Sequence, residues 1–178
     1  MENLRWPVII LTAVLALALW GGVSFYHQRY LKETPLVEQL IQMEEIEQAQ
    51  ILREHGEAVL IISTSPSFRG SMSQLYSRVE ELVLNELKEP LQIKFKDRRN
   101  QRLELFVREA APGLYEGARL GNYRQVAETI NMLKEKYQLA EVEFTVDYRR
   151  LYLQGRDGEY YLYLTVMVDT PEGGASDA

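Results

Sequence analysis

Three acidic residues near the C-terminus have the types and the spacing that acid–base or metal chemistry needs. Glu141, Glu143 and Asp147 fall on one face of a predicted strand, because alternate side chains of a strand point the same way. Paired carboxylates can act as general acid and general base, and clustered carboxylates can bind calcium. Acids on the wet face of a strand also serve only to keep a protein soluble, and we favour that interpretation.

A second candidate is the segment STSPSFRGSMS, residues 63–73. It places serines, Arg69 and backbone amides at the predicted start of a helix, which is a generic arrangement for binding an anion. The glycine spacing of a phosphate-binding loop is missing. We therefore favour the alternative, a connecting segment with ordinary capping residues.

The third candidate is the segment REAAPGLYEGARLG, residues 108–121. It contains Glu109, Tyr115, Glu116 and Arg119 among three glycines, and we predict a loop. Loops of about 12 or more residues are uncommon in compact domains and are often functional. No base, nucleophile or metal-ligand cluster accompanies these residues, so a lid or contact loop is favoured over enzyme chemistry.

The composition narrows the classes of function. The chain has no cysteine and two histidines, which excludes thiolate metal sites and cysteine nucleophiles and argues against a histidine-based triad. The net charge is −6, with both signs interspersed, whereas nucleic-acid binders present a basic face. We therefore expect no catalytic activity, no cofactor, no metal site and no nucleic-acid partner.

The N-terminal third is expected to position the domain relative to a membrane. After a short tail over residues 1–5, residues 6–26 (WPVIILTAVLALALWGGVSFY) carry no charge. About twenty such residues are enough to cross a bilayer as a helix, which predicts a single-pass anchor in the cell membrane, with a cleaved signal peptide as the alternative. The domain is expected on the extracytoplasmic side. Residues 27–55 are predicted to form a stalk, helical from Thr34 to Glu54.

The element order of residues 56–169 predicts a ferredoxin-like (split β-α-β) α+β domain with one extra C-terminal antiparallel strand. The expected elements are a strand at 57–65, a helix from Ser71 to Pro90, a hairpin over 91–107, a helix at 122–137 and a long C-terminal hairpin. That hairpin is expected to turn at Asp157–Gly158 and to carry a β-bulge at Arg149–Arg150. Residues 170–178 are expected to be a disordered tail.

The stretch GRDGEYYLYLTVMV, residues 155–168, divides by alternation into a core face and an outer face. Leu162, Leu164, Val166 and Val168 are predicted to point to the helices. A two-layer fold has no helix to cover the other face, which makes its large side chains candidate partner contacts. These candidates are Tyr152, Tyr161, Tyr163, Met167 and Phe106. Ordinary β-propensity explains the tyrosines equally well.

These features lead to two hypotheses about function. The first is a membrane-anchored protein-interaction or assembly module without catalytic activity, which binds a protein partner or forms a homo-oligomer. The alternative is a membrane-tethered domain that senses a small ligand. That alternative requires a concave pocket, expected under the 108–121 segment.

Overall fold

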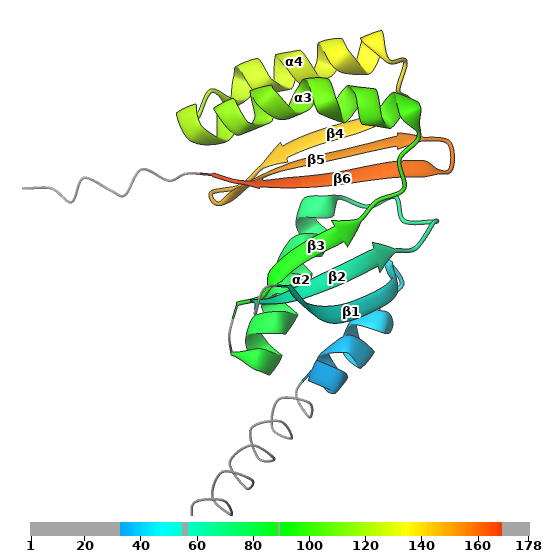
Figure 1. Ribbon diagram of the computed structural model, residues 1–178, viewed down its shortest axis with the longest axis vertical. Coiled ribbons are helices and arrows are strands. Elements are labelled where there is room, and N and C mark those ends of the chain that lie inside the picture. Colours follow the sequence, from blue (N-terminus) through cyan, green and yellow to red (C-terminus); the bar gives the residue numbers. More distant parts are fainter. Residues whose placement is uncertain (1–32, 55–56, 89, 169–178) are drawn as a thin grey trace, which may run out of the picture.

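The computed structural model describes residues 33–54, 57–88 and 90–168 (Figure 1). Residues 33–41 are helical and precede the first strand. The elements that follow are β1 (Ile46–Glu54), β2 (Glu57–Thr64), α2 (Met72–Leu87), β3 (Gln92–Lys96), α3 (Gln101–Leu120), α4 (Tyr123–Lys136), β4 (Glu141–Val146), β5 (Arg150–Asp157) and β6 (Tyr160–Met167). The strands form two three-stranded sheets, which we name sheet A (β1-β2-β3) and sheet B (β4-β5-β6).

Sheet A forms around the apolar strand β2. β1 pairs with β2 antiparallel, and β3 pairs with β2 parallel after the chain crosses over through α2. Val59, Leu60 and Ile62 of β2 are at most 1% exposed, which fits the central position predicted from the run Ala58–Ile62. Leu60 and Ile62 belong to a buried cluster that also contains residues of α2 and of the helical segment 33–41.

Sheet B is an antiparallel meander with α3 and α4 on one of its faces (Figure 1). Leu151, Leu153 and Leu162 on that face are fully buried against the two helices. The opposite face contributes Tyr152 and Tyr163 to the cluster formed with α2 and sheet A. Sheet B is therefore the middle of three layers.

A short bridge joins the two sheets directly. Arg98, which follows β3, and Tyr161 of β6 exchange two backbone hydrogen bonds of 2.9 and 2.8 Å. The chain then enters α3 at once, because Asn100 caps that helix by accepting a hydrogen bond from the Leu103 amide at 3.0 Å.

The predicted ferredoxin-like fold class is wrong, since the strands form two sheets and not one. The error begins at the predicted hairpin over 91–107, of which only β3 is a strand. Residues 101–120 form α3, including the segment predicted as a loop. The buried residues of this helix recur every three or four positions, as a helix on a core requires, although Pro112 lies inside it. They are Leu103, Phe106, Val107, Ala110, Leu114, Gly117 and Ala118.

The predicted helix from Thr34 to Glu54 is also not continuous. It ends after residue 41, and residues 46–54 form β1, paired along its length with β2. Glutamate and glutamine in this segment favour a helix locally, but pairing with β2 decides the conformation. The predicted helices at 71–90 and 122–137 agree with α2 and α4.

The C-terminal hairpin turns one residue later than predicted, at Gly158 and Glu159, with Gly158 at a φ of 64°. Leu153 pairs with Leu164, a shift of two residues from the predicted register that leaves each side chain on its expected face. The expected bulge at Arg149–Arg150 is instead a turn between β4 and β5. Asp147 forms it by accepting hydrogen bonds from the amides of both arginines at 2.7 Å.

No helix within residues 33–54, 57–88 and 90–168 is long and apolar enough to cross a membrane. The described helices therefore do not bear out the transmembrane part of the predicted fold class. The segment predicted as the anchor, 6–26, lies outside the described residues, as do the tails at 1–5 and 170–178. The extracytoplasmic location depends on the anchor and stays a prediction.

The packing of α3 on α4 depends on the absence of a side chain at Gly117. A Cβ at this position would overlap Cγ2 of Val126 on α4. Gly117→Ala should therefore lower the free energy of unfolding by about 1–3 kcal/mol, the usual cost of overpacking. Gly113 in the same helix has nothing within 4 Å of its Cβ position, so Gly113→Ala is the matched control. It should stabilise the protein by about 0.5–1 kcal/mol, because alanine favours helix interiors. Urea unfolding measures both changes, and equal effects would contradict this packing.

Candidate functional site

The face of sheet B that points away from α3 and α4 is lined by polar and aromatic side chains. The strand register arranges them in three rows, Glu141–Arg156–Tyr161, Glu143–Gln154–Tyr163 and Thr145–Tyr152–Thr165. This face meets α2, sheet A and the β2–α2 loop. We name it the inner face of sheet B.

Aromatic rings fill the centre of the inner face. Tyr152 meets Tyr76 of α2 edge to face at 5.6 Å, and Tyr163 meets Phe95 of β3 at 6.0 Å. Tyr152 is 1% exposed and Tyr163 is 7% exposed. Both hydroxyls are satisfied, since Tyr152 donates to Asp147 Oδ2 at 2.8 Å and the Tyr163 hydroxyl lies 3.1 Å from that of Thr64.

Burial raises the pKa of Tyr76, Tyr152 and Tyr163 above the ordinary value of a phenol, because the charged phenolate is poorly solvated there. The hydrogen bond to Asp147 raises the pKa of Tyr152 further. At neutral pH these tyrosines are uncharged packing groups.

An ion pair fastens one end of the inner face to α2. Arg150 is 7% exposed and donates to both carboxylate oxygens of Glu80, at 3.2 and 2.6 Å. Its guanidinium lies 4.4 Å from the ring centroid of Tyr76. Burial alone would lower the pKa of Arg150, but the bonds to Glu80 and the proximity of Tyr76 hold it above the ordinary value. Arg150 therefore remains charged.

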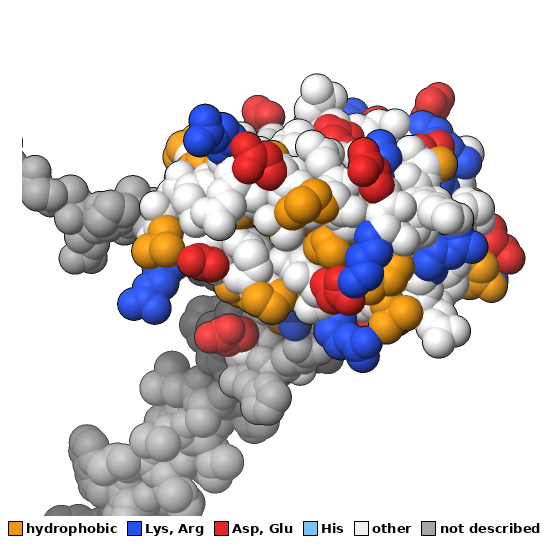
Figure 2. All heavy atoms as spheres, turned by 90° about the horizontal axis from the view of Figure 1, so that it is seen from above, with side chains coloured by type: hydrophobic (Ala, Val, Ile, Leu, Met, Phe, Trp, Pro, Cys, Tyr) orange, Lys and Arg blue, Asp and Glu red, His pale blue; other side chains and the backbone are white. Residues whose placement is uncertain are grey.

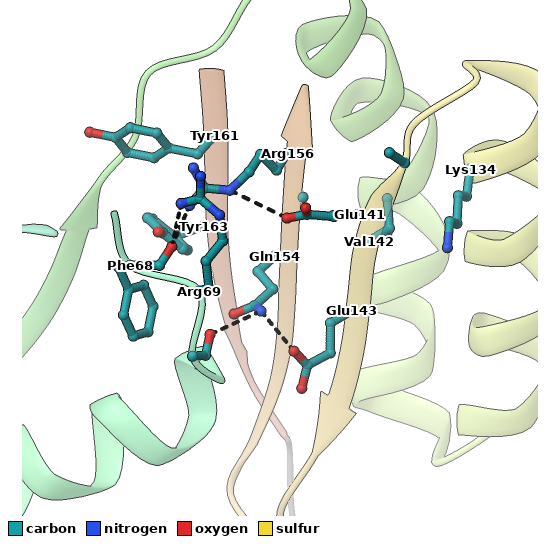
Figure 3. A pocket seen from close by; sticks show the side chains of 13 residues that line it. Phe68, Arg69, Lys134, Glu141, Val142, Glu143, Gln154, Arg156, Tyr161 and Tyr163 are labelled. Carbon is teal, nitrogen blue, oxygen red and sulfur yellow. Dashed lines mark hydrogen bonds and ion pairs between the residues drawn. The ribbon is translucent and has the colours of Figure 1, made fainter. Parts of the chain in front are cut away.

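Gln154 joins the inner face to the start of α2. Its Oε1 accepts a hydrogen bond from the Met72 amide at 2.8 Å, while Nε2 donates to Glu143 Oε2 at 2.7 Å and to the Gly70 carbonyl at 3.3 Å (Figure 3). Ser71, the N-cap residue, makes no side-chain capping bond and donates instead to Glu143 at 3.1 Å. The side-chain amide of Gln154 thus caps the N-terminus of α2, and the predicted capping residue Ser71 does not.

A cavity of about 450 Å³ opens at the other end of the inner face, beside the β2–α2 loop (Figure 3). It is lined by Phe68, Arg69 and Gly70 of the loop, by residues 141–143, 154–156, 161 and 163 of sheet B, and by Lys134 and Ala140. Two guanidinium groups meet at its edge. Arg156 Nη2 donates to the Phe68 carbonyl at 2.6 Å, and Arg69 Nη1 donates to the same oxygen at 3.0 Å.

The three acids predicted to share a face do not form one reactive group. Glu141 Oε2 lies 3.5 Å from Arg156 Nε, and Glu143 is held by Ser71 and Gln154. Asp147 closes the β4–β5 turn. Within the described part of the chain, no group of three or more acids and histidines is arranged to hold a metal ion.

Most of the predicted partner contacts lie inside the protein. Tyr152 and Tyr163 are buried on the inner face, Tyr161 packs partly buried beside them, and Phe106 of α3 is fully buried under the helical layer. The expectation that this face of sheet B is uncovered is wrong, because α2 and sheet A cover it. Met167, at 61% exposed, remains on the surface.

The residues predicted for the 108–121 loop lie along α3 and are not gathered at the cavity. Glu109 accepts hydrogen bonds from Lys136 at 2.7 Å and from the Tyr137 hydroxyl at 2.7 Å, and these bonds hold the pKa of its carboxyl below the usual value. Tyr115, Glu116 and Arg119 are exposed. The cavity lies on the opposite side of sheet B from α3, and not under this segment.

The residues that the sequence did not single out are Arg150, Gln154 and Arg156. They alternate with Leu151, Leu153 and Gly155 along β5, so the sequence could have predicted that they share a face. It could not have predicted which residues they contact. Comparison with protein-family models, curated proteins and solved structures gives no match, so the functional inference depends on this geometry.

Removing the Glu80 or the Arg150 side chain tests whether the ion pair holds α2 on sheet B. Glu80→Ala should lower the free energy of unfolding by about 3–5 kcal/mol, because it leaves the buried Arg150 guanidinium without its partner. Arg150→Ala should cost less, since the Glu80 side chain is 27% exposed and lies 3.9 Å from Arg149 Nη1. Arg150→Ala combined with Glu80→Ala should cost less than the sum of the single changes. Arg98→Ala is the control, since its ion pair with Glu159 is exposed and should contribute at most about 1 kcal/mol. Additive effects at Arg150 and Glu80 would show that the pair is not coupled.

The buried tyrosines predict a fall in stability at alkaline pH. A raised pKa means that the folded state keeps phenolic protons that the unfolded chain releases at about pH 10. Their contribution is complete below that pH and is lost as pH rises through the raised pKa values. The free energy of unfolding should therefore fall above about pH 10, and less steeply in Tyr152→Phe. Urea unfolding at a series of pH values measures the slope, with Tyr148→Phe at an exposed ring as control. An unchanged slope in Tyr152→Phe would refute this account.

Proposed function

We propose that this chain is an assembly module without catalytic activity, and that its partner is a second copy of the same chain. The observation that carries the proposal is the pair of exposed apolar side chains at the end of the edge strand β4. Val146 is 38% exposed and Tyr148 is 77% exposed, whereas the exposed Met167 lies on β6 at the other edge of sheet B. The Val168 amide donates to the Arg149 carbonyl at 2.7 Å, which brings the end of β6 beside the turn that carries Tyr148.

The edge next to this apolar end is available for pairing. β4 is the outer strand of sheet B, and within the described residues it pairs only with β5. Unpaired backbone groups along an edge are a ready template for another strand. Many proteins block such edges with lysine or proline, and β4 contains neither.

The outer surface of the helical layer supports assembly less well. Seen from above, its hydrophobic side chains are interspersed with charged ones (Figure 2). Tyr115, Leu120 and Met132 are exposed there, but scattered apolar residues are normal on a protein surface.

The side chains of β4 select one register for two-fold antiparallel pairing with a second copy. Centred on Phe144, this pairing sets Val142 opposite Val146 of the second copy and Glu143 opposite Thr145. Centred on Glu143 it would place two like charges directly opposite, which is unfavourable. The register centred on Phe144 also sets exposed Tyr148 opposite the small residue Ala140. At its ends it sets Glu141 opposite Asp147, where Asp147 accepts hydrogen bonds from the Arg149 and Arg150 amides and Glu141 lies 3.5 Å from Arg156 Nε, so each acid already has a partner in its own chain.

The absence of catalytic activity is part of the proposal. What supports it is the use of the candidate acids, since Glu141, Glu143 and Asp147 hold side chains and backbone amides of the same chain. An enzyme would need a base or nucleophile left available to a substrate.

The oligomeric state of the full-length chain tests the proposal. Sedimentation equilibrium should show a dimer, and Val146→Lys should shift it toward monomer, because a charged lysine on an edge opposes strand pairing. Leu52→Lys is the matched control, since Leu52 is 42% exposed on the edge strand β1 of sheet A. It should leave the dimer unchanged.

The chain contains no cysteine, so engineered pairs report the register without interference. Mixing Val142→Cys with Val146→Cys under oxidation should give a disulfide-linked dimer, and either variant alone should give far less. A chain that is monomeric at every concentration tested would refute the assembly. A dimer without this cross-link would refute the register centred on Phe144.

A further inference from the structure

We propose that the cavity beside the β2–α2 loop is a binding site for a small organic carboxylate, with Arg69 and Arg156 as the anion-binding pair. The cavity lies within one chain, so the proposal does not require the assembly through β4. The cavity has a volume of about 450 Å³, which lies in the range of small-molecule sites, about 300–1,000 Å³.

Two positive charges converge at the edge of this cavity. Arg156 donates to the carbonyls of Phe68 and Pro66, at 2.6 and 3.4 Å, and Arg69 donates to the same two oxygens, at 3.0 and 2.9 Å. The two guanidinium groups are therefore no farther apart than the length of two hydrogen bonds. Neutral carbonyls do not cancel two charges. Of the two acids that line the cavity, Glu143 is held by Ser71 and Gln154, and Glu141 lies 3.5 Å from Arg156 Nε, so Arg69 has no carboxylate partner within the described residues and a bound anion would offset the repulsion.

Hydrogen bonding to the loop carbonyls does not require two arginines. Arg156 extends from the central strand, its side chain is 12% exposed, and it holds the loop against sheet B. Arg69 belongs to the loop itself and duplicates those contacts with one nitrogen, Nη1. Within the described residues, Nε and Nη2 of Arg69 make no hydrogen bond. Arg69 is exposed, so these two donors of one guanidinium fork are accessible to a ligand, and carboxylates fit this geometry in a bidentate manner.

Glu141 already brings a carboxylate close to Arg156. Its Oε2 lies 3.5 Å from Arg156 Nε, whereas a strong bond between these groups is about 2.7–2.9 Å. The Glu141 side chain is 60% exposed, so little holds it there. We infer that Glu141 is a loosely bound internal substitute, which the carboxylate of a ligand displaces.

The remaining walls indicate what the carboxylate is attached to. Phe68, Tyr161 and Tyr163 line the same cavity (Figure 3), and the residues Phe68 and Tyr163 are each 7% exposed. The Phe68 ring packs against Gly70, and a Cβ at position 70 would lie 2.8 Å from that ring. Aromatic walls next to a charged end suit an anion with an apolar body.

Calorimetric titration of the full-length chain with benzoate tests the site, with benzamide as the neutral analogue of the same shape. Benzoate should bind and benzamide should not. Arg69→Gln should weaken benzoate binding about tenfold or more, the effect of losing a charge-assisted hydrogen bond. Glu141→Gln should strengthen binding, because it removes the competing carboxylate.

Arg124→Gln is the matched control, since Arg124 is an exposed arginine of α4 whose loss leaves the cavity unchanged. Its benzoate affinity should equal that of the unmodified chain. Binding of inorganic phosphate in place of benzoate would overturn the carboxylate assignment. Benzoate binding that survives in Arg69→Gln, or that is absent from the unmodified chain, would overturn the site. Neither result requires the chain to dimerise through β4.

Discussion

Strand β5 is covered on both faces, so each polar side chain that it carries must find a partner inside the protein. A buried polar group without a hydrogen bond is costly, and a buried charge without a partner is more so. Gln154 and Arg156 meet this demand with the start of α2 and with the carbonyls of the β2–α2 loop. Arg150 meets it in part, since both of its Nη atoms donate to Glu80 while its buried Nε has no hydrogen-bond partner within the described residues. These three contacts fix where α2 and its preceding loop lie on sheet B.

The same constraint makes the two halves of the domain depend on each other. The first amides of a helix have no partner within the helix, and a side chain at the N-cap usually accepts from one of them. At α2 the acceptor is Gln154, which is 82 residues away in the sequence, and Ser71 is used to hold Glu143. We therefore expect α2 and sheet B to unfold together, because neither satisfies its polar groups alone.

Local patterns in the sequence predicted α2, α4 and the inward face of β6, since each shows the periodicity of its element. The sequence pattern gave wrong predictions where the local preference of a segment differs from the conformation that its long-range contacts stabilise. Pro112, Gly113 and Gly117 gave α3 the composition of a loop, yet its apolar stripe packs on sheet B and stabilises the helix. The segment 46–54 has helix-favouring residues and becomes a strand only because β2 offers it an edge.

The cavity was beyond local prediction for a related reason. The segment with Arg69 was recognised as a possible anion site, but one arginine near a helix start is a weak signal. The second arginine lies 88 residues after the carbonyl of Phe68 that both share. Their convergence follows from the order of strands in sheet B and from its contact with the loop, which no spacing in the sequence encodes.

Strand β4 connects the two proposals physically. Its first residues line the cavity, and the pairing centred on Phe144 would set Tyr148 of a second copy opposite Ala140, which also lines the cavity. A ligand that displaces Glu141 from Arg156 would change the orientation of the Glu141 side chain at the start of the edge strand β4. Thermodynamic linkage then requires the effect to be reciprocal, so dimerisation changes ligand affinity by the same factor by which the ligand changes dimerisation. The position of Glu141, between the edge and the arginine pair, makes it the residue through which such coupling would act.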